Sequence, residues 1–386
     1  MRVALELQPC CGNRSGIGMY TYELAKRMKD GDGLEFCGNL FNFLNRNDNS
    51  AALHGIGMPV RTAKIFPYGV YRRIWNYLPI SYQQLFPGKA DLHVFFNYIV
   101  PPRIAGHVIT TVYDMTYIRY PETMDERNLR RIREGIDYSV ARSDRIVTIS
   151  EFSRQEICTL LDVPEEKISV VYSAPVQTGV CGDWAAVAKK QNITRPYILY
   201  VGTIEPRKNL TRLIRAFALL KQRHRIPHQL VLAGGKGWQN AEIYQAVEAA
   251  ACREDILFTG YISQDEKNAL YRNAEAFVFP SLYEGFGMPP LEAMQWECPV
   301  VCANTASLPE VVGDAARLVD PLEEEDLAEG LLQVITDKAY AAELVRRGSM
   351  QTEKFTWDAS AKQLTDACRD VWREHGIHTI EACTLL

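Results

Sequence analysis

The stretch AEAFVFPSLYEGFGMPPLEAM, residues 274–294, decides the fold of this 386-residue chain. Its apolar run Ala276–Phe279 predicts a buried strand, and Pro289-Pro290 favour the start of a helix, where the missing proline N–H needs no partner. Glu284 is then expected on the loop after the strand, and Glu292 about one turn into the helix. A strand, loop and helix of this kind predict an open α/β sheet, which binds ligands at the carboxyl ends of its strands.

The two carboxylates suit a ligand with many hydroxyl groups. A carboxylate accepts two hydrogen bonds side by side, which matches the paired hydroxyls of a ribose or a hexose. Gly285 and Gly287 let the backbone approach such a ligand closely and leave amides free to donate. A glutamate in the first turn of a helix is also favoured by the helix dipole alone. That alternative accounts for Glu292 but not for the whole stretch.

The length predicts two domains, because the chain is too long for one ordinary core. Lys and Arg number 43 against 47 Asp and Glu, and this near balance gives no reason to expect a nucleic acid partner. The ten cysteines lack the spacing of zinc ligands or of a disulfide framework, and free thiols fit a reducing cytoplasm. No apolar run approaches the ~20 residues that span a bilayer, and the start MRVALELQP does not resemble a signal peptide. We therefore expect a cytoplasmic protein.

Short apolar runs alternate with helical patterns along the whole chain, which predicts two doubly wound parallel sheets. In the first half we expect strands at Val3–Leu7, Leu92–Phe96, Val108–Val112, Arg145–Ser150 and Ser169–Tyr172. In the second half we expect them at Tyr197–Val201, Leu230–Ala233, Ile256–Phe258, Ala276–Phe279 and Val300–Cys302. The predicted boundaries are a first domain at 1–175, an aperiodic connection within 173–195, a second domain at 196–357 and a C-terminal helix at 358–374.

Glu284-(x7)-Glu292 resembles the Glu-x7-Glu motif of the retaining GT-B glycosyltransferases of glycosyltransferase family 4. The resemblance continues through YVGTIEPRKNL (200–210), VLAGG (231–235), FTGYIS (258–263), SEFSRQEI (150–157) and SGIGMYTYELA (15–25). It implies a GT-B fold, in which two Rossmann-like domains face a cleft and the C-terminal helix crosses back to the acceptor-binding first domain. It also implies a second domain that binds a nucleoside diphosphate sugar, and a retaining reaction without metal.

Arg207-Lys208 precede Asn209, a good N-cap residue for the helix that follows. A helix N-terminus with two cations beside it is a ready site for a diphosphate. In the family the lysine of this segment contacts the diphosphate, which assigns that role to Lys208. Many relatives have a second cation where this chain has Thr203, so Arg207 is the substitute. Solvated surface charge is the alternative for both cations.

The resemblance also assigns residues to the ribose and the sugar of the nucleoside diphosphate sugar. Glu292 is expected to bind the ribose hydroxyls, and Glu284 to bind the donor sugar. The backbone of Phe286, Gly287 and Met288 is expected to contact the same sugar.

In the first domain, Gly16 and Gly18 resemble the family's N-terminal loop, whose backbone donates to the distal phosphate. The two glycines also fit the start of a dehydrogenase fingerprint, but Thr21 stands where that pattern needs its third glycine.

Tyr113-Asp114 depart from the family, which often has His-Asp at this point, with the histidine near the donor sugar. Tyr113 is expected to bind substrate by donating a hydrogen bond, but tyrosine is a poor proton acceptor near neutral pH. If a protein group takes the proton of the acceptor hydroxyl, Asp114 is the candidate. The departing phosphate oxygen is the other candidate, and Asp114 at the cap of a turn is a third interpretation.

Two further segments bear on metal and membrane. Asp30-Gly31-Asp32 matches a metal motif of a different glycosyltransferase fold, but a turn of Asp and Gly is ordinary, and we expect neither metal nor another cofactor. Residues 64–86 interleave Lys64, Arg72 and Arg73 with aromatic side chains. They predict a peripheral contact with the inner face of a membrane, where a polyprenyl-linked acceptor would be met. An aromatic surface of the acceptor-binding domain or a buried helix is the alternative.

The sequence thus predicts a retaining hexosyltransferase. TIEPRKNL and EGFGMPPLE look like the bacterial polysaccharide mannosyltransferases of the family, so the favoured donor is GDP-mannose. The favoured acceptor is a hydroxyl on a glycan or lipid-linked oligosaccharide used in cell-surface polysaccharide synthesis. A UDP-hexose donor is the first alternative. A catalytically silent protein that binds sugar nucleotides or glycans is the second.

Overall fold

The computed structural model describes residues 1–11, 16–45, 49–77, 79–176 and 179–383. The chain forms two compact units, each with its own sheet. The first comprises Met1–Met115, Arg127–Ser173 and Trp357–Leu386. The second comprises Thr116–Glu126 and Ala174–Thr356. The short segment 116–126 therefore belongs with the second unit, although it lies within the predicted first domain.

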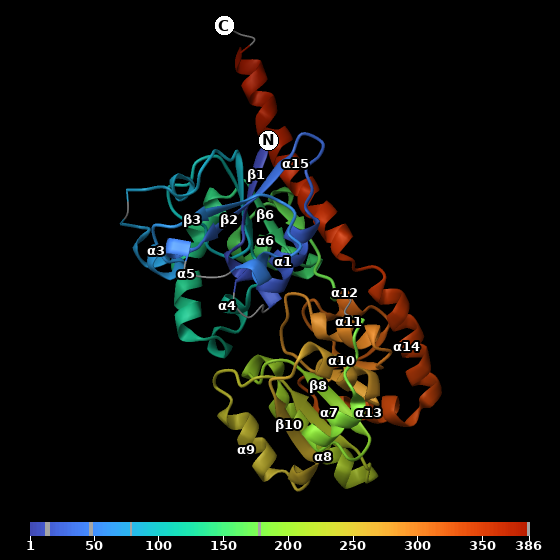
Figure 1. Ribbon diagram of the computed structural model, residues 1–386. Helices are drawn as coiled ribbons and strands as arrows, with labels where there is room; N and C mark the ends of the chain where they lie inside the picture. The colour runs from blue at the N-terminus through green and yellow to red at the C-terminus, as the bar shows by residue number, and fades with distance from the viewer. Residues whose placement is uncertain (12–15, 46–48, 78, 177–178, 384–386) are drawn as a thin grey trace. The chain divides into compact units, whose positions relative to one another are not determined.

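The first unit contains a parallel sheet with the strand order β3-β2-β1-β4-β5-β6-β7. Its strands are β1 (Arg2–Glu6), β2 (Glu35–Phe41), β3 (Val60–Ala63), β4 (Leu92–Phe95), β5 (His107–Thr111), β6 (Arg145–Thr148) and β7 (Ile168–Val170). Its main helices are α1 (Gly16–Arg27), α2 (Ser50–Leu53), α3 (Tyr68–Ile74), α5 (Glu126–Arg142), α6 (Glu151–Leu161) and α15 (Trp357–Cys383). α15 packs beside α1, β6 and β7 (Figure 1). The strand order reverses between β1 and β4, which makes that point the switch point of this sheet.

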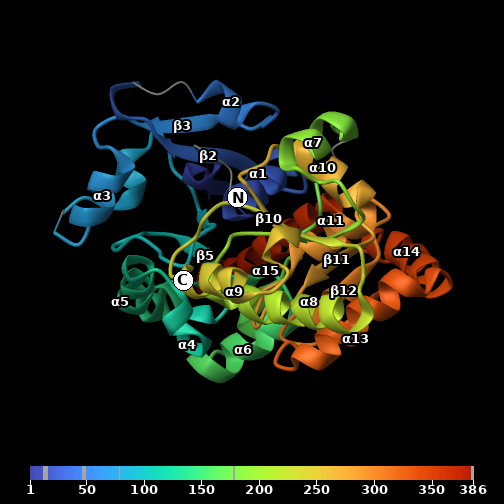
Figure 2. The same cartoon turned by 90° about the horizontal axis from the view of Figure 1, so that it is seen from below.

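The second unit contains a parallel sheet with the strand order β10-β9-β8-β11-β12-β13. Its strands are β8 (Tyr197–Val201), β9 (Gln229–Ala233), β10 (Ile256–Gly260), β11 (Ala276–Phe279), β12 (Val300–Ala303) and β13 (Ala316–Val319). Its helices include α4 (Thr116–Arg119), α7 (Trp184–Gln191), α8 (Leu210–His224), α9 (Ala241–Ala249) and α10 (Gln264–Asn273). They continue with α11 (Met288–Gln295), α12 (Leu308–Val312), α13 (Glu324–Thr336) and α14 (Lys338–Thr352). α9, α8 and α13 pack side by side, as Figure 2 shows, and the switch point lies between β8 and β11.

Every residue of β8 and β11 is buried, which explains why both appear in the sequence as unbroken apolar runs. A parallel sheet covered on both faces leaves only its strand ends open to ligands. The polar residues that follow β8 and β11 therefore mark the place where this unit can bind one.

Of the seven aromatic rings of residues 64–86, three are buried in the core of the first unit and three more pack against it partly buried, which favours the alternative of a buried aromatic segment. Buried rings from this stretch are Tyr71, Tyr82 and Phe86. They pack against Phe41 and Phe95 of the sheet. The stretch still exposes Ile65, Val70 and Tyr77. Among the described residues, no helix combines the length and the apolar character that crossing a bilayer requires.

Candidate functional site

Glu284 and Lys208 meet at the switch point of the second sheet. Lys208 ends the short 3₁₀ turn Pro206–Lys208 that follows β8, and Glu284 lies on the loop after the adjacent strand β11. The Nζ atom of Lys208 lies 2.5 Å from Oε1 of Glu284. Nη1 of Arg207 lies 3.0 Å from Oε2 of Glu284, and Nη2 of Arg207 lies 2.9 Å from Oε1 of Glu205. Two cations and two carboxylates from distant parts of the chain thus form one cluster with balanced charge: Arg207, Lys208, Glu205 and Glu284.

Burial makes these charges interact strongly. Glu284 is 8% exposed and Lys208 9% exposed. Burial alone would raise the pKa of Glu284, but the charges of Arg207 and Lys208 lower it to about 2. Burial and the neighbouring Arg207 lower the pKa of Lys208, while Glu284 and Glu205 oppose that shift. Glu284 is therefore an ionised carboxylate at neutral pH.

The conformation of the loop that carries Glu284 depends on Gly287 and on hydrogen bonds from Ser307 to the loop backbone. Gly287 has a φ of 105°, and a Cβ atom there would lie 2.4 Å from Cδ2 of Leu308. Conformation and space both require glycine at this point. The hydroxyl of buried Ser307 donates to the carbonyl oxygens of Glu284 at 2.9 Å and Phe286 at 2.8 Å. Met288 begins α11.

Glu292 lies in α11, as the sequence predicts, and faces α10. Its Oε1 accepts from Nζ of Lys267 at 2.7 Å, and its Oε2 accepts from the hydroxyl of Tyr271 at 3.0 Å. Both oxygens therefore have partners from α10. A ribose would add its hydroxyls to this arrangement or replace one of these partners.

Asn209 stands at the N-cap position of α8, but its side chain does not cap the helix. The residue has a left-handed backbone with a φ of 59°. Its side-chain nitrogen donates to the carbonyl oxygens of Pro280 at 3.1 Å and Pro321 at 2.6 Å. The expected cap is wrong in this respect. Asn209 instead fixes the start of α8 to the loop that follows β11.

In the first unit, the predicted glycines begin a helix. Gly16 is the first residue of α1, and Gly18 is buried in its first turn, while Ser15 lies outside the described residues. The first four N–H groups of an α-helix have no acceptor inside the helix. A phosphate contact from Gly16 and Gly18 would therefore use N–H groups of the first turn of α1.

Tyr113 and Asp114 lie in different surroundings. The hydroxyl of Tyr113 donates to the carbonyl oxygen of Phe96 at 3.0 Å, its ring packs against Tyr20, and burial raises its pKa well above the usual value. Asp114 is only partly buried, and its Oδ1 accepts from the hydroxyl of Tyr98 at 3.3 Å. Of the two, Asp114 is better placed to reach a ligand.

The family description "Glycosyl transferases group 1" matches residues 185–351. Almost the whole chain is similar to O-antigen chain mannosyltransferase B of Escherichia coli: the two are 31% identical over 382 residues, which cover 95% of this chain and 99% of that protein. This chain is a group 1 glycosyltransferase. A second relative, the serotype-specific mannosyltransferase WbdA of Escherichia coli, is 33% identical over 227 residues, 57% of this chain and 28% of WbdA.

Solved structures agree with this membership at the level of the fold. Sucrose-phosphate synthase from Thermosynechococcus elongatus aligns with a TM-score of 0.70 at 18% identity, over 97% of this chain and 100% of that one. HepE of Anabaena, solved in complex with UDP-glucose, aligns with a TM-score of 0.70 at 18% identity, over 96% of this chain and 100% of that one. The predicted GT-B fold with two Rossmann-like parallel-sheet domains is confirmed for this glycosyltransferase.

Several residues of this site escaped the sequence analysis. Ser307 holds the loop that carries Glu284, and Glu205 forms an ion pair with Arg207. Lys267 and Tyr271 both donate hydrogen bonds to Glu292. A signal for Ser307 was present, because the polar run NTAS follows the apolar strand Val300–Ala303. Lys267 and Tyr271 lie at helical spacing on α10, and only the packing of α10 on α11 reveals their role.

Asp30-Gly31-Asp32 matches a metal-binding motif, but the sequence predicts a turn without metal at this point. The Asp30 carboxylate accepts from the backbone N–H of Phe36 at 2.7 Å, and Asp32 forms an ion pair with Arg369 at 2.6 Å. These contacts fit a structural turn. Within the described ranges, no three His, Cys, Asp or Glu side chains gather closely enough to bind a metal ion.

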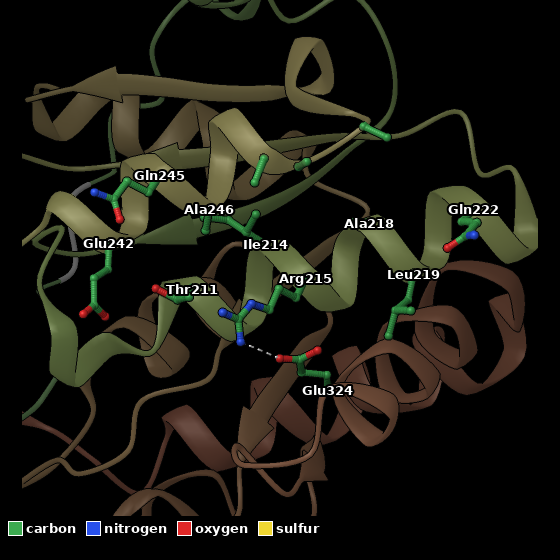
Figure 3. A pocket seen from close by; sticks show the side chains of 13 residues that line it. Thr211, Ile214, Arg215, Ala218, Leu219, Gln222, Glu242, Gln245, Ala246 and Glu324 are labelled. Carbon is green, nitrogen blue, oxygen red and sulfur yellow. Dashed lines mark hydrogen bonds and ion pairs between the residues drawn. The ribbon is translucent and has the colours of Figure 1, made fainter.

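A separate groove of the glycosyltransferase runs along α8 and α9 (Figure 3). Small and aliphatic side chains such as Ala218 and Ala246 line it, and Arg215 lies 3.2 Å from Glu324 at one side. The groove contains none of the predicted site residues. We assign no chemistry to it.

Proposed function

We propose that this glycosyltransferase moves mannose from GDP-mannose to a hydroxyl of a growing cell-surface polysaccharide, with retention of the anomeric configuration. The observation that supports this most directly is the buried cluster of Lys208, Arg207 and Glu284 at the switch point of the second sheet. The names of the relatives support mannose as the sugar and O-antigen as the class of product.

In the proposal, Lys208 and Arg207 bind the diphosphate of the donor beside the N-terminus of α8. The two cations and the helix dipole then stabilise the negative charge that grows on the departing nucleoside diphosphate. Without a donor, the Glu284 carboxylate neutralises these cations and keeps them at the end of β8. No metal or other cofactor is part of the proposed reaction.

Glu284 and the backbone of Phe286, Gly287 and Met288 are proposed to bind the mannose. An ionised carboxylate near the anomeric carbon stabilises the positive charge that develops there as the bond to phosphate breaks. The low pKa of Glu284 keeps it ionised through the reaction. Glu292 is proposed to bind the ribose hydroxyls with equal strength in the ground state and the transition state.

The acceptor side of the proposal places Asp114 as the group that takes the proton of the attacking hydroxyl. Tyr113 is proposed to act only by shaping the surroundings of Asp114, because its hydroxyl donates to a backbone carbonyl in the core. In the first unit, the N–H groups of Gly16 and Gly18 are proposed to contact the distal phosphate.

The experiment that tests the donor is a thermal-shift panel of GDP- and UDP-sugars on the full chain. A ligand present at 100 times its Kd adds about 2.7 kcal/mol to the free energy of unfolding. GDP-mannose should give the largest increase in Tm, and a larger increase with a UDP-sugar would replace it as the donor. Transfer to an α-mannoside followed by NMR of the new anomeric centre then tests retention. A β-linked product would contradict the proposed stereochemistry.

A peripheral contact with the inner face of a membrane is a smaller part of the proposal. Exposed Ile65, Val70 and Tyr77 together with exposed Arg73 support it. Co-sedimentation with vesicles of anionic and neutral lipid tests it. Wild type should bind the anionic vesicles more tightly than an Arg73→Glu/Tyr77→Ser variant, and equal binding by the two proteins would remove the membrane from the proposal.

A further inference from the structure

The switch point of the first sheet contains a buried carboxyl group that the proposed reaction does not use. Glu6 is the last residue of β1, next to β4, where the strand order reverses. It is 4% exposed, and its Oε1 has no hydrogen-bond partner in the described part of the chain. The backbone N–H of Gln8 is a partner for this carboxyl group. A buried carboxyl oxygen that still has no partner costs free energy, so Oε1 at a ligand-binding edge points to a ligand.

Arg72 lies near this carboxyl group, and a second arginine, Arg131, lies near Arg72. Arg72 comes from α3 and lies 5.5 Å above the ring of Tyr68, and its charge acts on Glu6. Arg131 comes from α5, and burial together with the charge of Arg72 lowers its pKa. Among the described residues, neither guanidinium forms an ion pair, and Nε of Arg131 is buried without a hydrogen-bond partner. Two like charges close together call for an anion between them.

Tyr98 connects Arg131 to Asp114, the residue that the proposal assigns to proton transfer. Tyr98 is close enough to Arg131 for their charges to interact, and its hydroxyl donates to Oδ1 of Asp114 at 3.3 Å. Both arginines are only partly buried, so a ligand can reach them. The cluster therefore lies where an acceptor bound near Asp114 would extend.

We propose that Arg72 and Arg131 bind an oxyanion, a phosphate or a carboxylate group, on the glycan acceptor. Glu6 forms a hydrogen bond with an acceptor hydroxyl beside it, and the ring of Tyr68 packs against the sugar. A planar guanidinium pairs with two oxygens of such a group at once, which makes arginine the residue suited to this contact. The identification of the ligand as the acceptor rests on the proposed function.

Isothermal titration of the full chain tests the site with three probes: methyl α-mannoside, its 6-phosphate and the corresponding uronate. The variants are Arg72→Gln and Arg131→Gln, with Arg130→Gln as a matched control because Arg130 is an exposed neighbour on the same helix. Lys208→Gln detects any binding of the anionic probes at the second sheet. Wild type should bind one anionic probe at least about tenfold more tightly than the neutral mannoside, since a hydrogen bond to a charged group is worth more than ~1.4 kcal/mol.

Each arginine variant should lower the affinity for that probe about tenfold, whereas Arg130→Gln should leave it unchanged. Preference for the phosphate indicates a phosphorylated acceptor such as a lipid-linked glycan, and preference for the uronate indicates an acidic sugar. Melting curves verify folding, and Arg131→Lys should recover part of the affinity.

Equal affinity for neutral and anionic mannosides would overturn the inference, as would unchanged affinity in both arginine variants. If donor transfer is found but the arginine variants bind the probes normally, this inference fails alone. If no sugar nucleotide binds but the arginine-dependent affinity persists, the proposed function fails and the oxyanion site stands.

Discussion

Glu284 and Glu6 both lie beside the switch point of a sheet, yet their surroundings give them opposite charge states. Each lies buried at the carboxyl edge beside a switch point, Glu284 after β11 and Glu6 at the end of β1. Arg207 and Lys208 contact Glu284 and lower its pKa to about 2. No ion pair compensates the burial of Glu6 within the described residues, and burial raises its pKa to about 8 despite the charge of Arg72.

The difference shows that sheet topology determines where such a carboxyl group lies, whereas neighbouring charges determine whether it is ionised. Both carboxyl groups lose contact with water, which favours the neutral form. Cations at 2.5 and 3.0 Å reverse that preference for Glu284. Near neutral pH, Glu284 of the second unit is therefore an ionised carboxylate between cations. Glu6 of the first unit is mostly protonated.

Glu284→Gln should produce the largest change, because it leaves Lys208 and Arg207 buried without their carboxylate. Breaking a buried ion pair at one end costs about 3–5 kcal/mol of the free energy of unfolding. Loss of a transition-state charge contact worth ~3 kcal/mol should also lower kcat about a hundredfold. Denaturant unfolding and steady-state kinetics with saturating acceptor measure the two effects.

A double mutant provides the control for this result. Glu284→Gln/Lys208→Met removes both ends of the ion pair, so its loss of stability should be smaller than the sum of the two single losses by about 0.5–3 kcal/mol. Strict additivity would mean that the contact between Glu284 and Lys208 contributes nothing. The contrast with Glu6 would then lose its electrostatic basis.

Glu6→Gln should change how stability depends on pH. The folded protein keeps the proton of Glu6 up to a pKa of about 8, whereas the ordinary value is 4.5. Between these values the folded state binds more protons than the unfolded state, so Glu6 makes wild type less stable as pH rises. Glutamine does not titrate. The stability of Glu6→Gln relative to wild type should therefore rise with pH, by at most about 1.4 kcal/mol per pH unit.

Urea unfolding of both proteins at pH 5, 6, 7 and 8 measures this difference. Subtracting the two curves removes the contributions of groups common to both proteins. The charged and titratable groups that interact with Glu6 are unchanged in the variant; they are Arg72, Tyr68, Tyr82 and Tyr113. A difference that stays constant from pH 5 to 8 would mean that burial does not raise the pKa of Glu6, and the contrast with Glu284 would end.

The sequence predicted the second unit better than the first. Buried strands such as Tyr197–Val201 and Ala276–Phe279 are unbroken apolar runs and were found at their observed positions. The strands Glu35–Phe41 and Val60–Ala63 were missed, because polar residues interrupt both runs. Helix α7 was missed too, since its eight residues are too few to establish a period.

The candidate site was predictable in its residue types and not in its contacts. Motifs placed Lys208 and Glu284 at strand ends, and adjacent strands then brought them together. No local pattern reveals that Lys267 and Tyr271 pair with Glu292, because that contact depends on the packing of two helices. The same reason hides Glu6, because its charged neighbour Arg72 comes from helix α3 and its own strand looks ordinary.

Glu292→Gln tests whether the two glutamates of the motif have different roles. Its pairs with Lys267 and Tyr271 are partly exposed, so the free energy of unfolding should fall by only about 1 kcal/mol or less. If Glu292 binds the ribose equally in the ground state and transition state, the donor KM should rise about tenfold while kcat stays nearly constant. Steady-state kinetics decides the roles. An unchanged KM in Glu292→Gln, with a raised KM at constant kcat in Glu284→Gln, would reverse the two assignments.

Ser307→Ala should have the smallest effect and tests whether the Glu284 loop needs its anchor. The hydroxyl of Ser307 donates to two carbonyl oxygens of this loop, at Glu284 and Phe286, whereas Glu6 is fixed within a strand. Loss of one buried hydroxyl should cost about 1 kcal/mol of stability, and the looser loop should raise the donor KM a few-fold. Thr305→Val is the matched control, because Thr305 donates to Ser281 at the start of the same loop. If both variants change stability alike and leave KM unchanged, Ser307 supports the fold and does not position Glu284 for the donor.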